Sequence, residues 1–292
     1  MGSSPTGPTL RGRPDVLPYN PGVARRTDGG RPDVPRSFPT RRFRNRRTLP
    51  TVALGAMAVG TAGLLVMLPA VSNACQVAPD TALVSADRVR DAIAPGSDVL
   101  IVGDSYTKGS GSTRSEHGWA QDIITDLGWD ATVDGVGGTG YVNTGVYGSS
   151  RVTFSARIAA HRDLDPELVL VQGSQNDWLV GPDRLRTTVE STLREAERQW
   201  PDAVVVAIGP SAPQPRAEST GGISAAVAAG AKAAGVTYID PLERQWFTAM
   251  NSPGFAASDG QHLNDVGYQY LADKVADALE DLAAPSEQPQ CL

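Results

Sequence analysis

The chain has little of several residue types on which common protein classes depend. It holds two cysteines and three histidines among 292 residues, so it cannot build a four-cysteine zinc site or a disulfide-dense scaffold. It contains no HExxH or CxxC motif, so the sequence implies no metal and no cofactor. Its composition also excludes a multi-span membrane protein, a collagen and a wholly disordered chain.

Charge is divided unevenly along the chain. Residues 1–48 hold eleven arginines and three aspartates, a net charge of +8. Because the whole chain carries −6, the remaining residues carry −6 − 8 = −14. An acidic body argues against nucleic acid as a main ligand. The basic arm of residues 1–48 is rich in proline and glycine and shows no apolar periodicity, so we expect it to be disordered.

A charge-free stretch follows the basic arm. No residue from 48 to 79 is charged, and the apolar centre runs from Thr51 to Leu68. This length is near the lower limit of about 17–25 residues for a membrane-spanning helix. The arginine cluster of residues 41–47 directly before it predicts a cytoplasmic N-terminus and an exported body.

Two interpretations of residues 49–74 stay open. They form either an uncleaved membrane anchor or a signal peptide cut after Ala74, where Ser72 and Ala74 supply the small residues of a cleavage site. The body is then held at the outer face of the cell membrane or secreted. Residues 75–292 suffice for one α/β domain with its own core, which we expect to be a monomer.

Cys75 and Cys291 stand near the two ends of this body. In an oxidising compartment they are better interpreted as a disulfide between the ends of the domain than as free thiols. Two unpaired thiols are the alternative. Peptide mapping without reductant separates the two cases, because only free thiols can be alkylated.

Short apolar runs alternate with helical patterns along the body. Continuous runs of this kind are typical of parallel strands buried on both faces. The predicted strands are residues 98–102, 131–133, 168–171, 203–208 and 236–239, and the predicted helices are residues 119–127, 185–200, 223–234 and 263–282. The alternation predicts a three-layer α/β/α sandwich with a mainly parallel five-stranded sheet, whose ligand site lies at the carboxyl ends of the strands.

The first predicted strand ends in Gly-Asp-Ser, whose serine is Ser105. Alone, this tripeptide is more often a turn or a helix cap. A serine nucleophile needs a base, and His262 lies three residues after Asp259, between the last strand and the last helix. One loop can then present both groups, with Asp259 on Nδ1 and Nε2 facing Ser105. We expect His117 and His161 to have surface or capping roles.

Two further segments follow predicted strands. Residues 135–140 are glycine-rich, and their backbone can turn an N–H toward a ligand. In residues 173–177 the side-chain amide of Asn176 is a donor. Acyl transfer needs such donors for its oxyanion, although ordinary turns also use these residue types. The glycine run is not GxGxxG, so a dinucleotide site is disfavoured.

Together the four blocks resemble the SGNH (GDSL-like) hydrolase superfamily. They occur in the family's order, and the resemblance spans residues 98–283. The blocks depart from the family pattern in places: the third block carries one extra residue, and the second lacks its usual asparagine. Tyr106 also stands where many members have leucine. The resemblance implies a flavodoxin-like fold and ester hydrolysis through an acyl-enzyme.

The resemblance also assigns roles to residues of this chain. Ser105 is the expected nucleophile, His262 the general base and then acid, and Asp259 the carboxylate that orients the imidazole. The expected oxyanion donors are the N–H of Ser105, the N–H of Gly138, with Gly137 as the alternative, and the amide of Asn176. The expected substrate is a small-molecule or carbohydrate ester.

Two other functions remain compatible with this resemblance. An exported acyltransferase would pass an acyl group to or from a cell-wall sugar, and only the acceptor distinguishes it from a hydrolase. A catalytically silent carbohydrate-binding domain is the third possibility, against which the complete residue set argues. Hydrolysis of a simple ester without added sugar distinguishes the hydrolase from the acyltransferase.

The charge pattern generates a prediction about topology. Protease added to spheroplasts is expected to degrade the body, because the arginine cluster retains only the N-terminal arm in the cytoplasm. Immunoblotting against the body before and after lysis is the measurement. Full protection until lysis would contradict an exported domain.

Overall fold

The computed structural model describes residues 84–285. The basic arm, the apolar segment of residues 49–74 and both cysteines lie outside these residues. Within the described part, no helix combines the length and apolar character needed to cross a bilayer.

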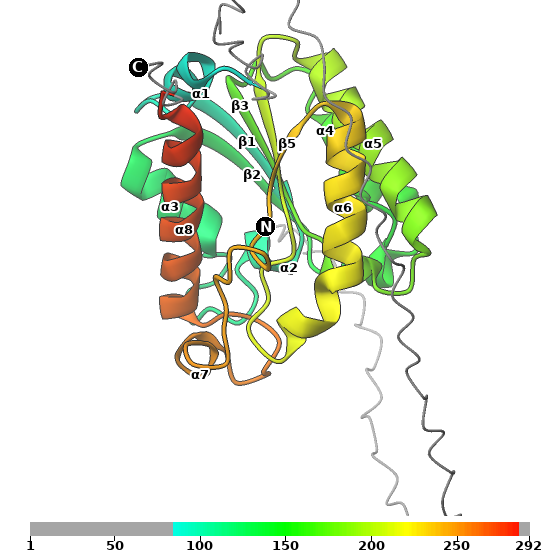
Figure 1. Cartoon of the computed structure of the whole chain (residues 1–292), viewed down its shortest axis with the longest axis vertical. Helices are drawn as coiled ribbons and strands as arrows, with labels where there is room; N and C mark the ends of the chain where they lie inside the picture. Colours follow the sequence, from blue (N-terminus) through cyan, green and yellow to red (C-terminus); the bar gives the residue numbers. More distant parts are fainter. Residues whose placement is uncertain (1–83, 286–292) are drawn as a thin grey trace, which may run out of the picture. The chain divides into compact units, whose positions relative to one another are not determined.

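Five parallel strands form the sheet, in the order β2-β1-β3-β4-β5 (Figure 1). The strands are β1 (Asp98–Gly103), β2 (Asp130–Gly135), β3 (Leu168–Gln172), β4 (Val204–Ile208) and β5 (Thr237–Ile239). Every residue of β3 and β4 is buried, because helices cover both faces of the sheet and leave no wet side. The predicted five-stranded parallel sheet is confirmed.

Helices lie on both sides of the sheet (Figure 1). One layer consists of α1 (Ala86–Ala92), α3 (Trp119–Leu127) and α8 (Asp265–Ala283), and the other of α4 (Phe154–Ala160), α5 (Pro182–Gln199) and α6 (Gly221–Ala234). Two short helices, α2 (Ser105–Lys108) and α7 (Ser252–Phe255), belong to the loops after strands. The three-layer α/β/α sandwich predicted from the alternation is therefore confirmed.

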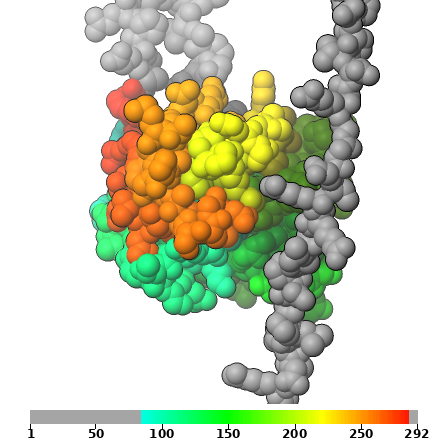
Figure 2. All heavy atoms as spheres, turned by 90° about the horizontal axis from the view of Figure 1, so that it is seen from below, coloured from blue at the N-terminus to red at the C-terminus, as the bar shows by residue number. Residues whose placement is uncertain are grey.

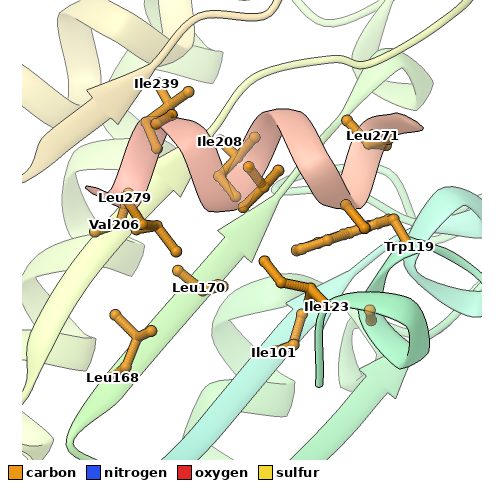
Figure 3. Packing of buried hydrophobic residues seen from close by; sticks show 14 of the residues in the cluster. Ile101, Trp119, Ile123, Leu168, Leu170, Val206, Ile208, Ile239, Leu271 and Leu279 are labelled. Atoms are coloured by element: carbon orange, nitrogen blue, oxygen red, sulfur yellow. The ribbon is translucent and has the colours of Figure 1, made fainter. Parts of the chain in front are cut away.

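Two hydrophobic clusters hold the three layers together. Alternate residues of a strand point to opposite faces, so Ile101 and Leu170 pack with Trp119 and Leu271 in the cluster under α3 and α8 (Figure 3). Their neighbours Leu100 and Val169 belong to the cluster under α4, α5 and α6.

The register of the strands determines where the loops begin. Gly103, at the end of β1, pairs with Gly135 in β2 and with Gln172 in β3. The carboxyl ends of three neighbouring strands therefore reach the same level. The loops that follow β1, β2 and β3 leave the sheet side by side.

The last helix differs from the sequence prediction at its start. Helix α8 begins at Asp265, and Asn264 caps it by accepting a hydrogen bond from the Gly267 N–H at 2.9 Å. Leu263 is buried before the helix, whereas Val266 is 63% exposed. The predicted start at residue 263 is therefore two residues too early, because the extended backbone of Asn264 caps the helix just before Asp265.

The contact between α5 and α6 generates a stability prediction. A Cβ added to Gly230 would lie 2.6 Å from Val189 Cβ and 2.7 Å from the Arg186 carbonyl oxygen. Alanine favours a helix by about 1 kcal/mol over glycine, but overpacking costs about 1–3 kcal/mol. Because a backbone oxygen cannot move aside easily, Gly230→Ala should lower the free energy of unfolding in urea by about 1–2 kcal/mol.

Gly222→Ala is the matched control on the same helix. A Cβ there meets nothing within 4 Å, so this variant should be unchanged or up to about 1 kcal/mol more stable. A stabilised Gly230→Ala protein would contradict the close packing of α5 on α6.

Candidate active site

Ser105 lies where the chain turns from strand β1 directly into helix α2. The Asp104 side chain caps this helix by accepting a hydrogen bond from the Tyr106 N–H at 2.9 Å. The turn is so tight that a Cβ on Gly103 would lie 2.0 Å from Thr107 Oγ1, so only glycine fits there. Ser105 itself is 6% exposed and is held on the first residue of a capped turn.

The loop between α7 and α8 presents a carboxylate and an imidazole to this serine. His262 Nε2 lies 2.9 Å from Ser105 Oγ, and His262 Nδ1 lies 2.6 Å from Asp259 Oδ2. Asp259 Oδ1 accepts hydrogen bonds from the backbone N–H groups of His262 and Gln261 at 2.9 and 2.8 Å. Figure 2, which looks at the view of Figure 1 from below, shows the orange segment that contains this loop on the face turned to the reader.

The charge state of Asp259 suits a partner of imidazole. Slight burial works to raise its pKa, but the hydrogen bonds from His262 and Gln261 outweigh it and lower the pKa to about 2. Asp259 is therefore ionised at neutral pH and accepts the Nδ1 proton. Nε2 is then the unprotonated nitrogen that faces the Ser105 hydroxyl.

Tyr106 connects the serine turn to the histidine loop. Its hydroxyl donates a hydrogen bond to the Gln261 carbonyl oxygen, and its ring centre lies 5.5 Å from that of His262. Burial raises the pKa of Tyr106 well above its usual value, so the hydroxyl remains a donor. The sequence showed Tyr106 only as a departure from the common leucine, and its contact with residue 261 requires the folded chain.

The glycine-rich segment forms a tight turn beside Ser105. The Thr139 N–H reaches the Val136 carbonyl oxygen at 3.4 Å, and Gly138 has a φ of +77°. A Cβ added to Gly137 would lie 3.8 Å from Ser105 Cβ. Within residues 84–285 neither Gly137 N–H nor Gly138 N–H has a hydrogen-bond acceptor. Both therefore remain candidate oxyanion donors.

Asn176 lies against the same turn from the loop after β3. Its side-chain amide donates a hydrogen bond to the Thr139 carbonyl oxygen at 2.9 Å and makes a longer contact of 3.4 Å with Asp104 Oδ2. The next residue, Asp177, accepts hydrogen bonds from the backbone N–H groups of Tyr141 and Asn143 at 2.9 and 2.7 Å. The loops after β2 and β3 are thus joined beside the serine.

Arg157, on α4, fixes the bases of these loops. Only 5% of it is exposed, and its guanidinium donates to the Gly103 carbonyl oxygen and to Asp134 Oδ1, each at 2.8 Å, and to Thr139 Oγ1 at 3.2 Å. One buried cation therefore connects β1, β2 and the glycine turn. Sequence reasoning missed Arg157, since nothing local marks an arginine that bonds residues 18 to 54 positions away.

The remaining histidines and Ser174 make other contacts. His117 is paired with Asp122 at 2.7 Å and His161 with Asp134 at 2.9 Å. Ser174 is buried and accepts a hydrogen bond from the Asn176 N–H. Among residues 84–285, no cluster of three or more histidine, cysteine or acidic side chains is arranged to hold a metal.

The buried cap residue generates a pH prediction. Asp104 is fully buried, and burial raises its pKa to about 7 despite the opposing effects of the Tyr106 N–H and Arg157. A carboxyl group with a raised folded-state pKa contributes stability that is fully present below its ordinary pKa of about 4 and is lost progressively as pH rises through about 7.

Asp104→Asn keeps an oxygen that can cap α2 but cannot ionise. The loss of unfolding free energy between pH 5 and pH 8 should therefore be smaller in this variant, by up to about 2–3 kcal/mol. Urea unfolding of both proteins at the two pH values measures it. An equal loss in both proteins would show that Asp104 does not titrate in this range.

Comparisons with known proteins agree with this architecture. The sequence matches the GDSL-like lipase/acylhydrolase family over residues 101–270. A GDSL lipase of Mycobacterium tuberculosis is 32% identical over 194 residues, which cover 61% of this chain and 79% of that protein.

A solved structure extends the agreement to the fold. A protein of the G-D-S-L family from Desulfitobacterium hafniense has a TM-score of 0.51 at 14% identity, covering 62% of this chain and 99% of that one. With residues 101–270 matched and the parallel sheet in place, the chain belongs to the GDSL-like lipase/acylhydrolase family, within the SGNH hydrolase superfamily, and is an acyl ester hydrolase.

Proposed function

We propose that the chain is an exported serine esterase that cleaves carboxylic esters through an acyl-enzyme on Ser105. The observation that carries the proposal is the continuous hydrogen-bonded series from Asp259 to His262 to Ser105, with separations of 2.6 and 2.9 Å. A serine next to an oriented imidazole is an activated nucleophile.

In the proposed acylation step, Ser105 Oγ attacks the ester carbonyl carbon while His262 Nε2 takes the hydroxyl proton. The carboxylate of Asp259 stabilises the imidazolium that forms. As the tetrahedral intermediate collapses, His262 gives this proton to the departing alkoxide, and the alcohol leaves. In deacylation, a water molecule attacks the acyl carbonyl carbon while His262 takes its proton. His262 then returns a proton to Ser105 Oγ, and the carboxylic acid leaves.

The oxyanion of each intermediate needs preorganised donors. The proposed donors are the Ser105 N–H, the N–H of Gly138 or Gly137, and the side-chain amide of Asn176. The amide nitrogen of Asn176 donates one hydrogen to the Thr139 carbonyl oxygen at 2.9 Å. Its contact with Asp104 Oδ2 is longer, at 3.4 Å, and therefore weaker. The second hydrogen makes only this long contact, so it is available to an oxyanion while the first stays bonded to Thr139.

Export is proposed from the sequence alone. Residues 1–48 form the cytoplasmic arm, residues 49–74 the anchor or signal peptide, and residues 75–292 the esterase domain. In an oxidising compartment Cys75 and Cys291 join the ends of this domain. The acidic body and its ester substrate then meet outside the cytoplasmic membrane.

The mechanism predicts how single substitutions combine. Ser105→Ala and His262→Ala should each lower kcat by several powers of ten, and the double variant should be little worse than either, because the two residues act as a unit. His117→Ala is the matched control and should retain kcat within about threefold, because the imidazole of His117 is paired with Asp122 on α3 and not with Ser105. Hydrolysis of 4-nitrophenyl acetate without added sugar is the assay.

Asn176→Ala should lower kcat by about 10²–10³, the range for one oxyanion donor, while KM changes much less.

Two results would contradict the assignment of Ser105 and His262. One is a double variant, Ser105→Ala with His262→Ala, whose loss in kcat equals the product of the two single losses. The other is normal turnover by Ser105→Ala. A wild-type enzyme that turns over only when a sugar acceptor is added would instead indicate an acyltransferase.

A further inference from the structure

A cavity lined by both polar and apolar groups lies beside the proposed catalytic residues and has no role in the chemistry described above. Its volume is about 250 Å³. Its walls come from the loop after β3, from the segment between β4 and α6, and from the first turn of α6, and consist of Gln175, Trp178, Arg216, Ser219, Thr220 and Ile223. Five of these six side chains carry a polar group that can donate or accept a hydrogen bond.

Two contacts place this cavity next to the ester-cleaving groups. Gln175 directly precedes Asn176. On the other side, Arg216 Nη1 donates a hydrogen bond at 2.9 Å to Oε1 of Gln261, the residue before His262. In Figure 2 the yellow segment containing Arg216 lies beside the orange segment containing Gln261.

Gln175 is the most informative residue of the cavity wall. It is only 3% exposed, and neither its amide nitrogen nor its amide oxygen has a partner within residues 84–285. A buried amide left unpaired lowers stability, so such groups normally have a partner. A ligand that satisfies this amide must offer a donor and an acceptor close together, as neighbouring hydroxyl groups do.

Trp178 gives the same cavity a flat apolar surface. It is 66% exposed, which is unusual for the largest aromatic side chain unless it binds something. A ligand that suits an exposed indole, an unpaired amide and a guanidinium has one apolar face and several hydroxyl groups. A pyranose ring has both, and a hydrocarbon chain lacks the hydroxyl groups.

We propose that this cavity binds a sugar that carries the scissile ester, so the substrate is an O-acylated carbohydrate whose sugar stacks on Trp178 and bonds to Gln175 and Arg216. The inference rests on the proposed esterase function, because the sugar is the alcohol that leaves the ester carbonyl carbon when Ser105 is acylated. A site built to pair with substrate hydroxyl groups discriminates strongly against analogues that lack them.

The test compares two acetate esters of primary alcohols, 6-O-acetylglucose and ethyl acetate, on the full-length chain. They share the acyl group and differ in the sugar. Wild-type kcat/KM should be at least tenfold higher for 6-O-acetylglucose. Trp178→Ala and Gln175→Leu should each reduce this preference at least fivefold, mainly through KM for the sugar ester, and leave kcat/KM for ethyl acetate within twofold.

Tyr147→Ala is the matched control, because Tyr147 is an exposed aromatic residue outside the cavity, with 53% of its surface accessible. It should keep the full preference. Equal activity of the wild type on both esters would overturn the inference, as would equal losses on both in the Trp178 and Gln175 variants. So would faster cleavage of emulsified tributyrin than of the sugar ester, with loss of that activity in Trp178→Ala.

These outcomes are distinguishable from failure of the esterase itself. If wild-type protein cleaves neither ester, or if Ser105→Ala cleaves both normally, the proposed function is wrong. If wild-type protein cleaves ethyl acetate through Ser105 but shows no preference for the sugar ester, only the carbohydrate site is wrong.

Discussion

The in-register parallel pairing of the three strands β2, β1 and β3 is the constraint on which the site depends. Gly103 is paired with Gly135 on one side and with Gln172 on the other, so three loops leave the sheet from one level. Ser105, the glycine turn and Asn176 follow these strand ends within a few residues. His262 is 157 positions from Ser105 in sequence and meets it only because α8 packs on the same sheet.

Buried polar contacts convert this rough proximity into a defined geometry. Arg157 bonds to the strand ends, Asp177 to the loop after β2, and Tyr106 to the histidine loop. Each of these side chains is buried, and an unpaired buried polar group is costly. The loops are therefore stabilised in the arrangement that pairs all three, and this is also the arrangement that sets Ser105 facing His262.

Much of the fold follows from local patterns in the sequence. The runs at β1, β3 and β4 are continuously apolar because helices cover both faces, and this periodicity is visible without a structure. The helical pattern of residues 119–127 is also visible locally, and Gly128, with a φ of +69°, follows directly and ends α3. The short helices α1 and α4 were not predicted, because seven residues contain too few turns to show a helical period. The start of α8 was predicted two residues too early, because periodicity alone does not reveal where a helix starts. The candidate residues were found by motif, whereas Arg157, Gln175 and Arg216 have no local signal, since their roles depend on contacts across the fold.

The central claim is that His262 activates Ser105 as the nucleophile. Its most direct measurement is covalent labelling of the full-length chain with an organophosphonate ester, followed by mapping of the modified peptide by mass spectrometry. The account predicts one adduct, on Ser105, which forms much more slowly in His262→Ala and is absent from Ser105→Ala. Ser174 is the internal control, because it is buried in the neighbouring loop and bonds to the Asn176 N–H. An adduct on Ser174 with Ser105 unmodified, or equally fast labelling without His262, would contradict the account.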